Sequence, residues 1–315
     1  MSKMFRVGPS PHIRTSETVE TVMYDVIIAL VPAFLVAWYI FGIRAFIITA
    51  VAMLTCMLTE YFWQKIIKQE AYIFDGSAIL TGILLAFVVP PFMPLQYVII
   101  GSIVSIALGK MVFGGLGQNI FNPALVGRAF IQASWPIAIT TFALDGKGGA
   151  TILDAMKRGL PLQEALVNTG NIYLETFIGR MGGTTGETSA LALLLGGLYL
   201  IYRKQIDWKV PTIIIGTVFL ITLSVGANPW LHISSGGLFL GAFFMATDMV
   251  TSPYTDKGRV IFALLIGILI SAIRLRGGYP EGVAYSILMA NAVVPLINRY
   301  CNPRVFGEVK KNGKK

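Results

Sequence analysis

Apolar stretches separated by short polar segments run along nearly the whole chain, and they predict a bundle of membrane-spanning helices. A straight helix needs about 20 apolar residues to cross the hydrocarbon core of a bilayer, so the shorter stretches need flanking amphipathic turns or cross only in part. Ten stretches can be recognised, in two sets of five. The first set spans 26–43, 45–63, 76–89, 95–109 and 123–142, and the second spans 189–202, 210–225, 236–247, 260–273 and 282–297.

The two sets recur at a nearly constant interval. Matching stretches begin 159 to 165 residues apart, which indicates a duplicated unit. Because each unit has an odd number of crossings, the second copy enters the membrane from the opposite face. The pattern therefore predicts an all-α polytopic membrane protein of about ten transmembrane helices, arranged as two inverted five-helix repeats. The alternative is that any ten-helix protein shows rough spacing of this kind.

The same pattern divides the chain into five segments. These are a cytoplasmic N-terminal segment (1–20), the first repeat (21–142), an outer-face loop (143–188), the second repeat (189–298) and a basic cytoplasmic tail (299–315). The third stretch of each repeat is short and glycine-rich, with Gly82 and Gly241 at similar places. Short glycine-interrupted segments at matching positions are typical of a central site in transporters. Close helix packing through small residues is the simpler explanation of the glycines alone.

Composition supports the membrane class. The 315 residues are 55% hydrophobic and 13% charged, with a mean hydropathy of +0.70, whereas soluble domains carry roughly 25% charged residues. Residues 1–20 are polar and no small-residue cleavage site follows the first apolar stretch, so we expect that stretch to be a transmembrane helix and not a signal peptide.

The distribution of basic residues predicts the orientation. With the N-terminus in the cytoplasm of a bacterial inner membrane, 18 of the 25 Lys and Arg residues fall on the cytoplasmic side. Both termini are then cytoplasmic, and the long loop 143–188 lies on the outer face. This loop contains an amphipathic stretch from Ile152 to Leu166, interrupted at Gly159. Cytoplasmic loops account for the net charge of +9, and no nucleic-acid partner is needed.

Cysteine and histidine limit the possible cofactors. The chain has two residues of each type, without a CxxC motif or a helical His pair, which argues against an iron–sulfur, zinc or bis-His haem site. Six ionisable residues lie near the apolar stretches: Asp25, Glu60, Lys110, Arg128, Asp248 and Arg274. For most of them we expect the side chain to extend to the interface. If the chain carries electrons, its carrier must need neither thiolate nor imidazole ligands, and a flavin meets that condition. We expect Arg128 to face such a flavin or pair with an acid, and Asp248 to lie on an ion path.

Several motifs occur in a fixed order: SPHIR (10–14), GGLGQNIFNPALVGRAF (114–130), TDMVTSPYTDKGR (247–259), RGGYPEGVAYSILMANAVVPLI (276–297) and NPRVFG (302–307). Together they resemble the RnfD/NqrB family, which comprises the D subunits of Rnf complexes and, more distantly, the B subunits of sodium-pumping NADH:quinone oxidoreductases. The resemblance covers nearly the whole chain.

The resemblance implies FMN bound through its phosphate to a threonine in an S-G-A-T motif. The matching residues are Gly149, Ala150 and Thr151, followed by Asp154, while Gly148 replaces the commoner serine. Small residues before Thr151 let a flavin transferase approach its hydroxyl, and Asp154 would position a divalent cation with the FMN donor. Local residues alone favour another interpretation, in which Thr151 caps a helix. Thr188-Ser189 is expected to be a cap without flavin.

The resemblance also implies a second, non-covalent flavin, riboflavin, in the membrane part. Asn119 and Asn122 in segment 114–125 supply amide donors and acceptors suited to an isoalloxazine edge, and Arg128 follows nearby. The alternative is a turn in which both asparagines cap backbone groups before Pro123.

The function implied by the resemblance is that of a membrane subunit of an Rnf-type complex. Such a complex moves electrons between ferredoxin and NAD and couples this to sodium or proton translocation. The chain would relay electrons through FMN on the outer face. Its partners would be the other membrane subunits, an outer subunit with its own covalent FMN and a flavin transferase, and it would not be catalytic alone. The alternatives are a small-solute transporter or channel with inverted repeats, or a structural anchor without a cofactor.

Overall fold

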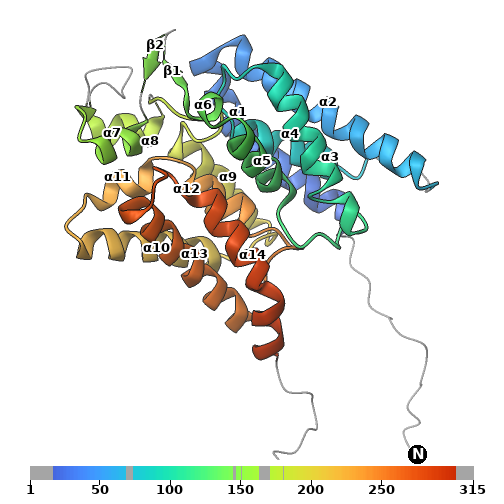
Figure 1. Ribbon diagram of the computed structural model, residues 1–315. Coiled ribbons are helices and arrows are strands. Elements are labelled where there is room, and N and C mark those ends of the chain that lie inside the picture. The colour runs from blue at the N-terminus through green and yellow to red at the C-terminus, as the bar shows by residue number, and fades with distance from the viewer. Residues whose placement is uncertain are drawn as a thin grey trace, which may run out of the picture.

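The computed structural model describes residues 17–68, 74–144, 147–149, 151–162, 171–179 and 181–302. Four segments are long and apolar enough to cross a membrane: α1 (Val19–Phe41), α2 (Ile43–Ile66), α4 with the following 3-10 turn (Leu95–Phe113) and α13 (Asp256–Arg276). The molecule is a helical membrane protein, as predicted (Figure 1). Its ten crossings and their inverted arrangement stay a prediction.

The remaining apolar stretches also carry helices. They are α3 (Ser77–Phe87), α5 (Pro123–Ser134), α9 (Ala190–Tyr202), α10 (Lys209–Ser224), α12 (Leu238–Leu240) continued by the π-helical turn η3 (Gly241–Met245), and α14 (Val283–Tyr300). The fifth stretch breaks at Trp135, because Pro136 lacks an N–H group and excludes the residue before it from helical geometry. The short helix α6 (Pro136–Thr140) follows the break.

The two halves of the chain meet through matching helices. Helix α1 packs against α9, and α5 packs against α14, while α2 packs on α3 and α4, and α10 packs on α13. Gly82 and Gly241 serve close packing, as expected for small residues. A Cβ atom at Gly82 would lie 2.6 Å from the Met53 Cα atom, and one at Gly241 would lie 2.4 Å from a methyl group of Val283.

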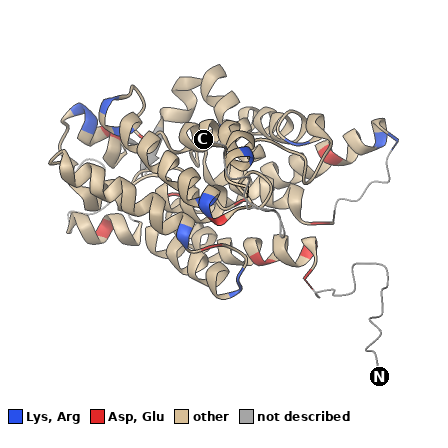
Figure 2. Ribbon diagram, turned by 90° about the horizontal axis from the view of Figure 1, so that it is seen from below, with Lys and Arg blue, Asp and Glu red and all other residues tan. Residues whose placement is uncertain are grey.

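Large apolar side chains cover the outside of the long helices. They include Ile28, Val31 and Leu35 on α1 and Leu54, Leu58 and Phe62 on α2, all of them exposed. Figure 2 shows most of the helical ribbon in tan, without Lys, Arg, Asp or Glu. A continuous exposed apolar surface of this kind is unfavourable in water and suits contact with lipid.

The expectation that most ionisable residues extend to the interface is wrong. Asp25 on α1 is buried and accepts hydrogen bonds from Tyr199 and Arg203. Glu60 and Lys110 are each 2% exposed and form an ion pair at 2.8 Å. Arg274 is also buried. A buried charge needs a partner, and these residues find theirs across helix–helix contacts that sequence position does not reveal.

The predicted outer-face loop contains short elements. A two-stranded antiparallel hairpin joins β1 (Phe142–Leu144) to β2 (Lys147–Gly149), with Phe142 opposite Gly149. Helices α7 (Ile152–Arg158) and α8 (Ile172–Ile178) follow and pack against α11 (Pro229–Ser234). The hairpin lies at one end of the molecule, and the last turn of α14 lies at the other (Figure 1).

Candidate functional site

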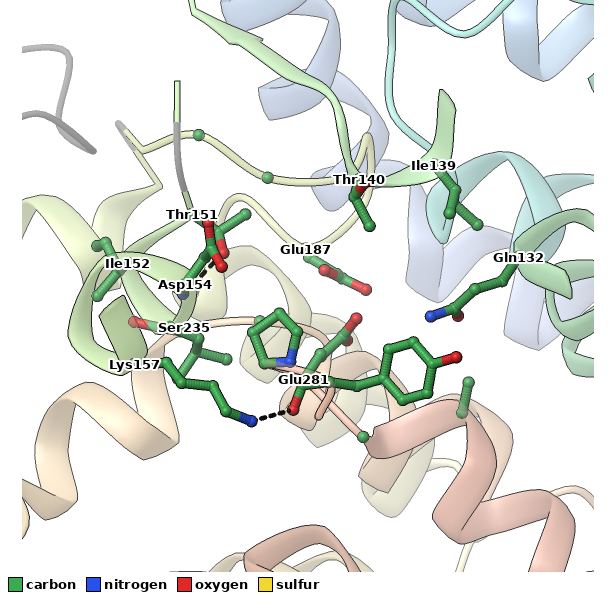
Figure 3. A pocket seen from close by; sticks show the side chains of 18 of the residues that line it. Gln132, Ile139, Thr140, Thr151, Ile152, Asp154, Lys157, Glu187, Ser235 and Glu281 are labelled. Atoms are coloured by element: carbon green, nitrogen blue, oxygen red, sulfur yellow. Dashed lines mark hydrogen bonds between the residues drawn. The ribbon is translucent and has the colours of Figure 1, made fainter. Parts of the chain in front are cut away.

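A cavity of about 460 Å³ lies where α5, α7, the segment before α9 and the α13–α14 connection meet. We call it the Thr151 pocket, and its polar lining includes Arg128, Gln132, Thr151, Lys157, Glu187 and Glu281. Figure 3 shows Thr151 and Asp154 on one side and Gln132 on the opposite side, with the carboxyl groups of Glu187 and Glu281 between them. The structure thus brings the predicted attachment threonine together with Arg128.

Thr151 is the N-cap of α7. Its side-chain oxygen accepts a hydrogen bond from the backbone N–H of Asp154 at 3.2 Å, so the capping interpretation is confirmed. The Asp154 carboxylate pairs with Arg158 Nε at 2.8 Å. Gly149 lies in β2, and Ala150 lies outside the described residues. The cap leaves Thr151 partly exposed at the cavity.

Helix α7 is docked by its apolar face and by one lysine. Ile152 and Ala155 are buried against Met181, which confirms the amphipathic pattern over 152–158. On the other face, Lys157 Nζ donates to the carbonyl oxygens of Gly277 and Tyr279, the latter at 2.9 Å. Partial burial lowers the pKa of Lys157, and the Asp154 carboxylate opposes this shift. These contacts fix Thr151 relative to the α13–α14 connection.

Arg128 binds the carboxyl groups of two acidic residues. Its Nη1 donates to Glu187 Oε1 at 3.1 Å, and its Nη2 donates to Glu281 Oε2. The expectation that Arg128 pairs with an acid is confirmed. Its grouping with Asn119 and Asn122 is corrected, because they line a separate cavity. The three residues are close in sequence, which suggested a common site. Asn122 lies at the N-terminus of α5, whereas Arg128 lies further along the helix and lines the Thr151 pocket.

Glu187 lies in a loop that is hydrogen-bonded to the C-terminal end of α3. The backbone N–H of Gly186 donates to the Phe87 carbonyl at 2.9 Å, and the N–H of Thr185 donates to the Val89 carbonyl at 3.0 Å. Thr184 Oγ1 donates to the Phe87 carbonyl at 2.8 Å. These bonds satisfy carbonyl groups that the end of a helix leaves unpaired. The loop is therefore fixed to the C-terminal end of α3 through the carbonyl groups of Phe87 and Val89, and Glu187 lines the cavity from this loop.

Glu281 is positioned by backbone contacts on two sides. Its Oε1 accepts from the N–H of Gly237 at 2.8 Å, and its carbonyl oxygen accepts from Arg274 Nε at 3.0 Å. Sequence reasoning missed both Glu187 and Glu281 as site residues. The available signal was weak: each is an acid next to glycine, in the segment just before an apolar stretch.

Asn119 and Asn122 line a smaller cavity of about 90 Å³, together with Ser77, Lys110 and Asp248. Asn122 caps α5 by accepting from the N–H groups of Ala124 and Leu125. Asn119 Nδ2 donates to the carbonyl oxygen of Phe121 at 3.2 Å. Both asparagines thus bond to local backbone as the turn interpretation predicted. Ser189 likewise caps α9, as expected.

Comparison with known proteins identifies the family. The family described as NQR2, RnfD, RnfE matches residues 6–307. The chain is 46% identical to the D subunit of the proton-translocating ferredoxin:NAD(+) oxidoreductase complex of Clostridium ljungdahlii, with 96% of each chain covered. It is 45% identical to the D subunit of the Na(+)-translocating ferredoxin:NAD(+) oxidoreductase complex of Acetobacterium woodii, with 98% of each covered. As its motifs indicated, the chain belongs to the NQR2, RnfD, RnfE family.

Proposed function

We propose that this chain is the D subunit of an Rnf-type membrane complex and carries FMN esterified to Thr151. The complex would couple electron transfer between ferredoxin and NAD to sodium or proton translocation. The names of the two relatives from C. ljungdahlii and A. woodii support the complex and differ in the ion. The partners would be further membrane subunits, an outer subunit with its own covalent FMN, and a flavin transferase.

The main support for the proposed cofactor is the cavity beside the Thr151 hydroxyl. Its volume of about 460 Å³ falls in the range of small-molecule sites, roughly 300–1,000 Å³. Two of its lining residues have buried polar atoms without a hydrogen-bond partner among the described residues, Arg128 Nε and Ser235 Oγ. Buried polar atoms in native proteins are normally paired, so these two are suited to a polar ligand. An isoalloxazine ring, with two carbonyl oxygens and ring nitrogens, fits that requirement.

The residues of the pocket have distinct roles in this proposal. Thr151 Oγ1 would form the phosphoester, and α7 would hold it at the cavity edge through the Lys157 contacts. Arg128 Nε–H and the Ser235 hydroxyl would bind the polar edge of the ring. FMN supplies one- and two-electron transfer when bound. The chain's residues fix its position and tune its electronics.

We also propose a second, non-covalent flavin, whose binding requires a change in the structure. Riboflavin at Asn119 and Asn122 would require the smaller cavity to open, because about 90 Å³ holds only a few water molecules. Arg128 takes no part in it, since it lines the Thr151 pocket. The amide groups of both asparagines would have to exchange backbone partners for the ring.

We propose the inverted two-repeat topology with both termini in the cytoplasm and the loop 143–188 outside the inner membrane. Packing of α1 on α9 and of α5 on α14 supports it, since these pairs hold matching places in the two halves. A cysteine introduced at Lys147 should react with a membrane-impermeant thiol reagent in intact cells, and one at Lys204 should not. The reverse labelling pattern would place the proposed FMN on the cytoplasmic side and contradict the topology.

The attachment is tested by flavin fluorescence in a denaturing gel. Wild-type protein expressed with a flavin transferase should give a fluorescent band, and Thr151→Ala should give a dark band of equal protein content. Thr140→Ala is the matched control, because it removes a hydroxyl from the same pocket and should stay fluorescent. A dark wild-type band would refute the relay and leave the small-solute transporter or the cofactor-free anchor.

A further inference from the structure

Two carboxyl groups meet within the Thr151 pocket. We propose that Glu187 and Glu281 share one proton there and that Glu187 exchanges this proton with the redox group carried by Thr151. The shared proton is a property of the chain alone, whereas the exchange rests on the proposed function. The pair is therefore a protonation site beside Thr151, on the proposed outer face of the membrane.

The geometry places the two carboxyl groups against each other. A Cβ atom at Gly237 would lie 2.6 Å from Glu187 Oε1 and 2.6 Å from Glu281 Oε1, so both oxygens converge on one backbone position that only glycine leaves open. Figure 3 shows the two side chains pointing toward one another. Two carboxyl groups that converge in this way can hydrogen-bond to each other only when one of them carries a proton, because carboxylates only accept.

The charges around the pair favour one proton. Among the described residues, one guanidinium, that of Arg128, bonds to both acids. Arg274 also faces them, but its donors go to the backbone carbonyls of Glu281, His232 and Ser235. The other titratable or charged residues that line the cavity in the described part of the chain are Asp154, Lys157, Arg158, Tyr279 and Tyr285. Two carboxyl groups sharing one site cannot both ionise at the usual pH, so the pKa of one of them rises.

The asymmetry of the pair identifies the proton carrier. Both acids lie in connections between helices. Burial, together with the charge of Glu281, raises the pKa of Glu187 well above its usual value. Burial also acts to raise the pKa of Glu281, but Arg128 and the hydrogen bond from Glu187 lower it below its usual value. Glu281 also accepts hydrogen bonds at both of its oxygens, from the Gly237 N–H and from Arg128 Nη2, as an ionised carboxylate does. We therefore assign the proton to Glu187 and the negative charge to Glu281.

The exposure of the two side chains suggests how the proton is replaced. The Glu281 side chain is 16% exposed and that of Glu187 is 5% exposed. With FMN bound, one-electron transfer from a reduced donor protein would oxidise that donor and draw one proton from Glu187, which would become a carboxylate. Glu187 would regain a proton from bulk water through Glu281, and reoxidation would return one proton to water by the same two residues. A positioned acid suits a cavity with little water.

The shared proton is tested by infrared spectroscopy of the full-length chain purified without flavin. At pH 7 the wild type should show the C=O stretching band of a protonated carboxyl group, shifted in D₂O. Glu187→Gln should remove that band, and the matched pocket variant Asp154→Asn should keep it. Absence of the band in the wild type, or its persistence in Glu187→Gln, would overturn the shared proton. If Glu187→Gln fails to fold, the wild-type spectrum can still refute the shared proton, because the band must be present there.

The exchange is tested on protein that carries flavin. Redox difference spectra should show the Glu187 band losing intensity on reduction, and the midpoint potential of the flavin should depend less on pH in Glu187→Gln than in the wild type. A band that is present but unchanged by reduction would overturn the exchange and leave the shared proton intact. A wild type that binds no flavin would overturn the proposed function together with the exchange, while the flavin-free spectra would still decide the proton.

Discussion

Two buried charge clusters in this molecule differ in whether their hydrogen-bonding capacity is filled. Lys110 uses all three of its donors, on both oxygens of Glu60 at 2.8 Å and on the Ser77 hydroxyl at 2.6 Å. Arg128 in the Thr151 pocket binds two acids, and its Nε has no partner in the part of the chain that the structure describes. Both clusters hold two acids, because Asp75 accepts from the Ser77 hydroxyl beside Lys110, and both border a cavity. The cavity at Arg128 is the larger, about 460 Å³ against about 90 Å³.

The difference separates a structural cluster from a functional one. A filled cluster gains nothing from a ligand, and its charges lock the helices that carry them. An unfilled cluster beside a cavity retains donors and a proton that a ligand can use. Perturbed and incompletely paired groups in a cavity are typical of functional sites. Burial alone does not distinguish the two, since Lys110 is more deeply buried than Arg128.

The largest expected effect is on the filled cluster. Lys110→Met leaves Glu60 buried without its cation, which should lower the free energy of unfolding by about 3–5 kcal/mol. The double variant Lys110→Met with Glu60→Leu should recover most of this loss, because the Glu60 carboxylate is then no longer buried without its cation. Thermal unfolding in detergent measures both. If the single and double variants were equally unstable, the unpaired charge of Glu60 would not be the cause of the loss, and the Glu60–Lys110 ion pair itself would stabilise the helix packing.

A smaller effect should distinguish the two acids of the pocket. Glu281→Gln removes the charged partner of Arg128 and should cost about 2–3 kcal/mol. Glu187→Gln replaces a protonated carboxyl group by a neutral amide of the same shape and should cost less than about 1 kcal/mol. The same unfolding measurement compares the two variants. If Glu187→Gln were the more damaging, Glu187 would be the charged partner and the assignment of the proton would be reversed.

The smallest effect concerns the attachment of α7 to the pocket. Lys157→Met removes two hydrogen bonds to the α13–α14 connection and should weaken docking of α7 by about 1 kcal/mol. Faster hydrogen exchange at residues 152–158 should report it. Arg158→Met is the control, since the Arg158 side chain is 67% exposed and pairs with Asp154 of the same helix. Identical exchange in both variants would mean that the apolar face alone holds α7.

Much of the architecture could be predicted because its causes are local. The apolar stretches marked the positions of the helices, and the hydroxyl and amide side chains at Thr151, Ser189 and Asn122 marked their N-caps. The break at Trp135 was not predicted, although Pro136 is a sufficient reason for it. Burial of Glu60 with Lys110 was also missed, because two residues 50 positions apart give no sign of being neighbours.

The sequence by itself determined the membrane class, the helices, their caps and the family, since hydrophobic runs, capping side chains and motifs act over a few residues. Only the tertiary structure decided that Arg128, Glu187 and Glu281 meet beside Thr151. The Arg128 bonds span 59 and 153 residues. Such contacts depend on how α5, the end of α3 and the α13–α14 connection pack in space. Charge balance and unfilled donors exist only after that packing has formed.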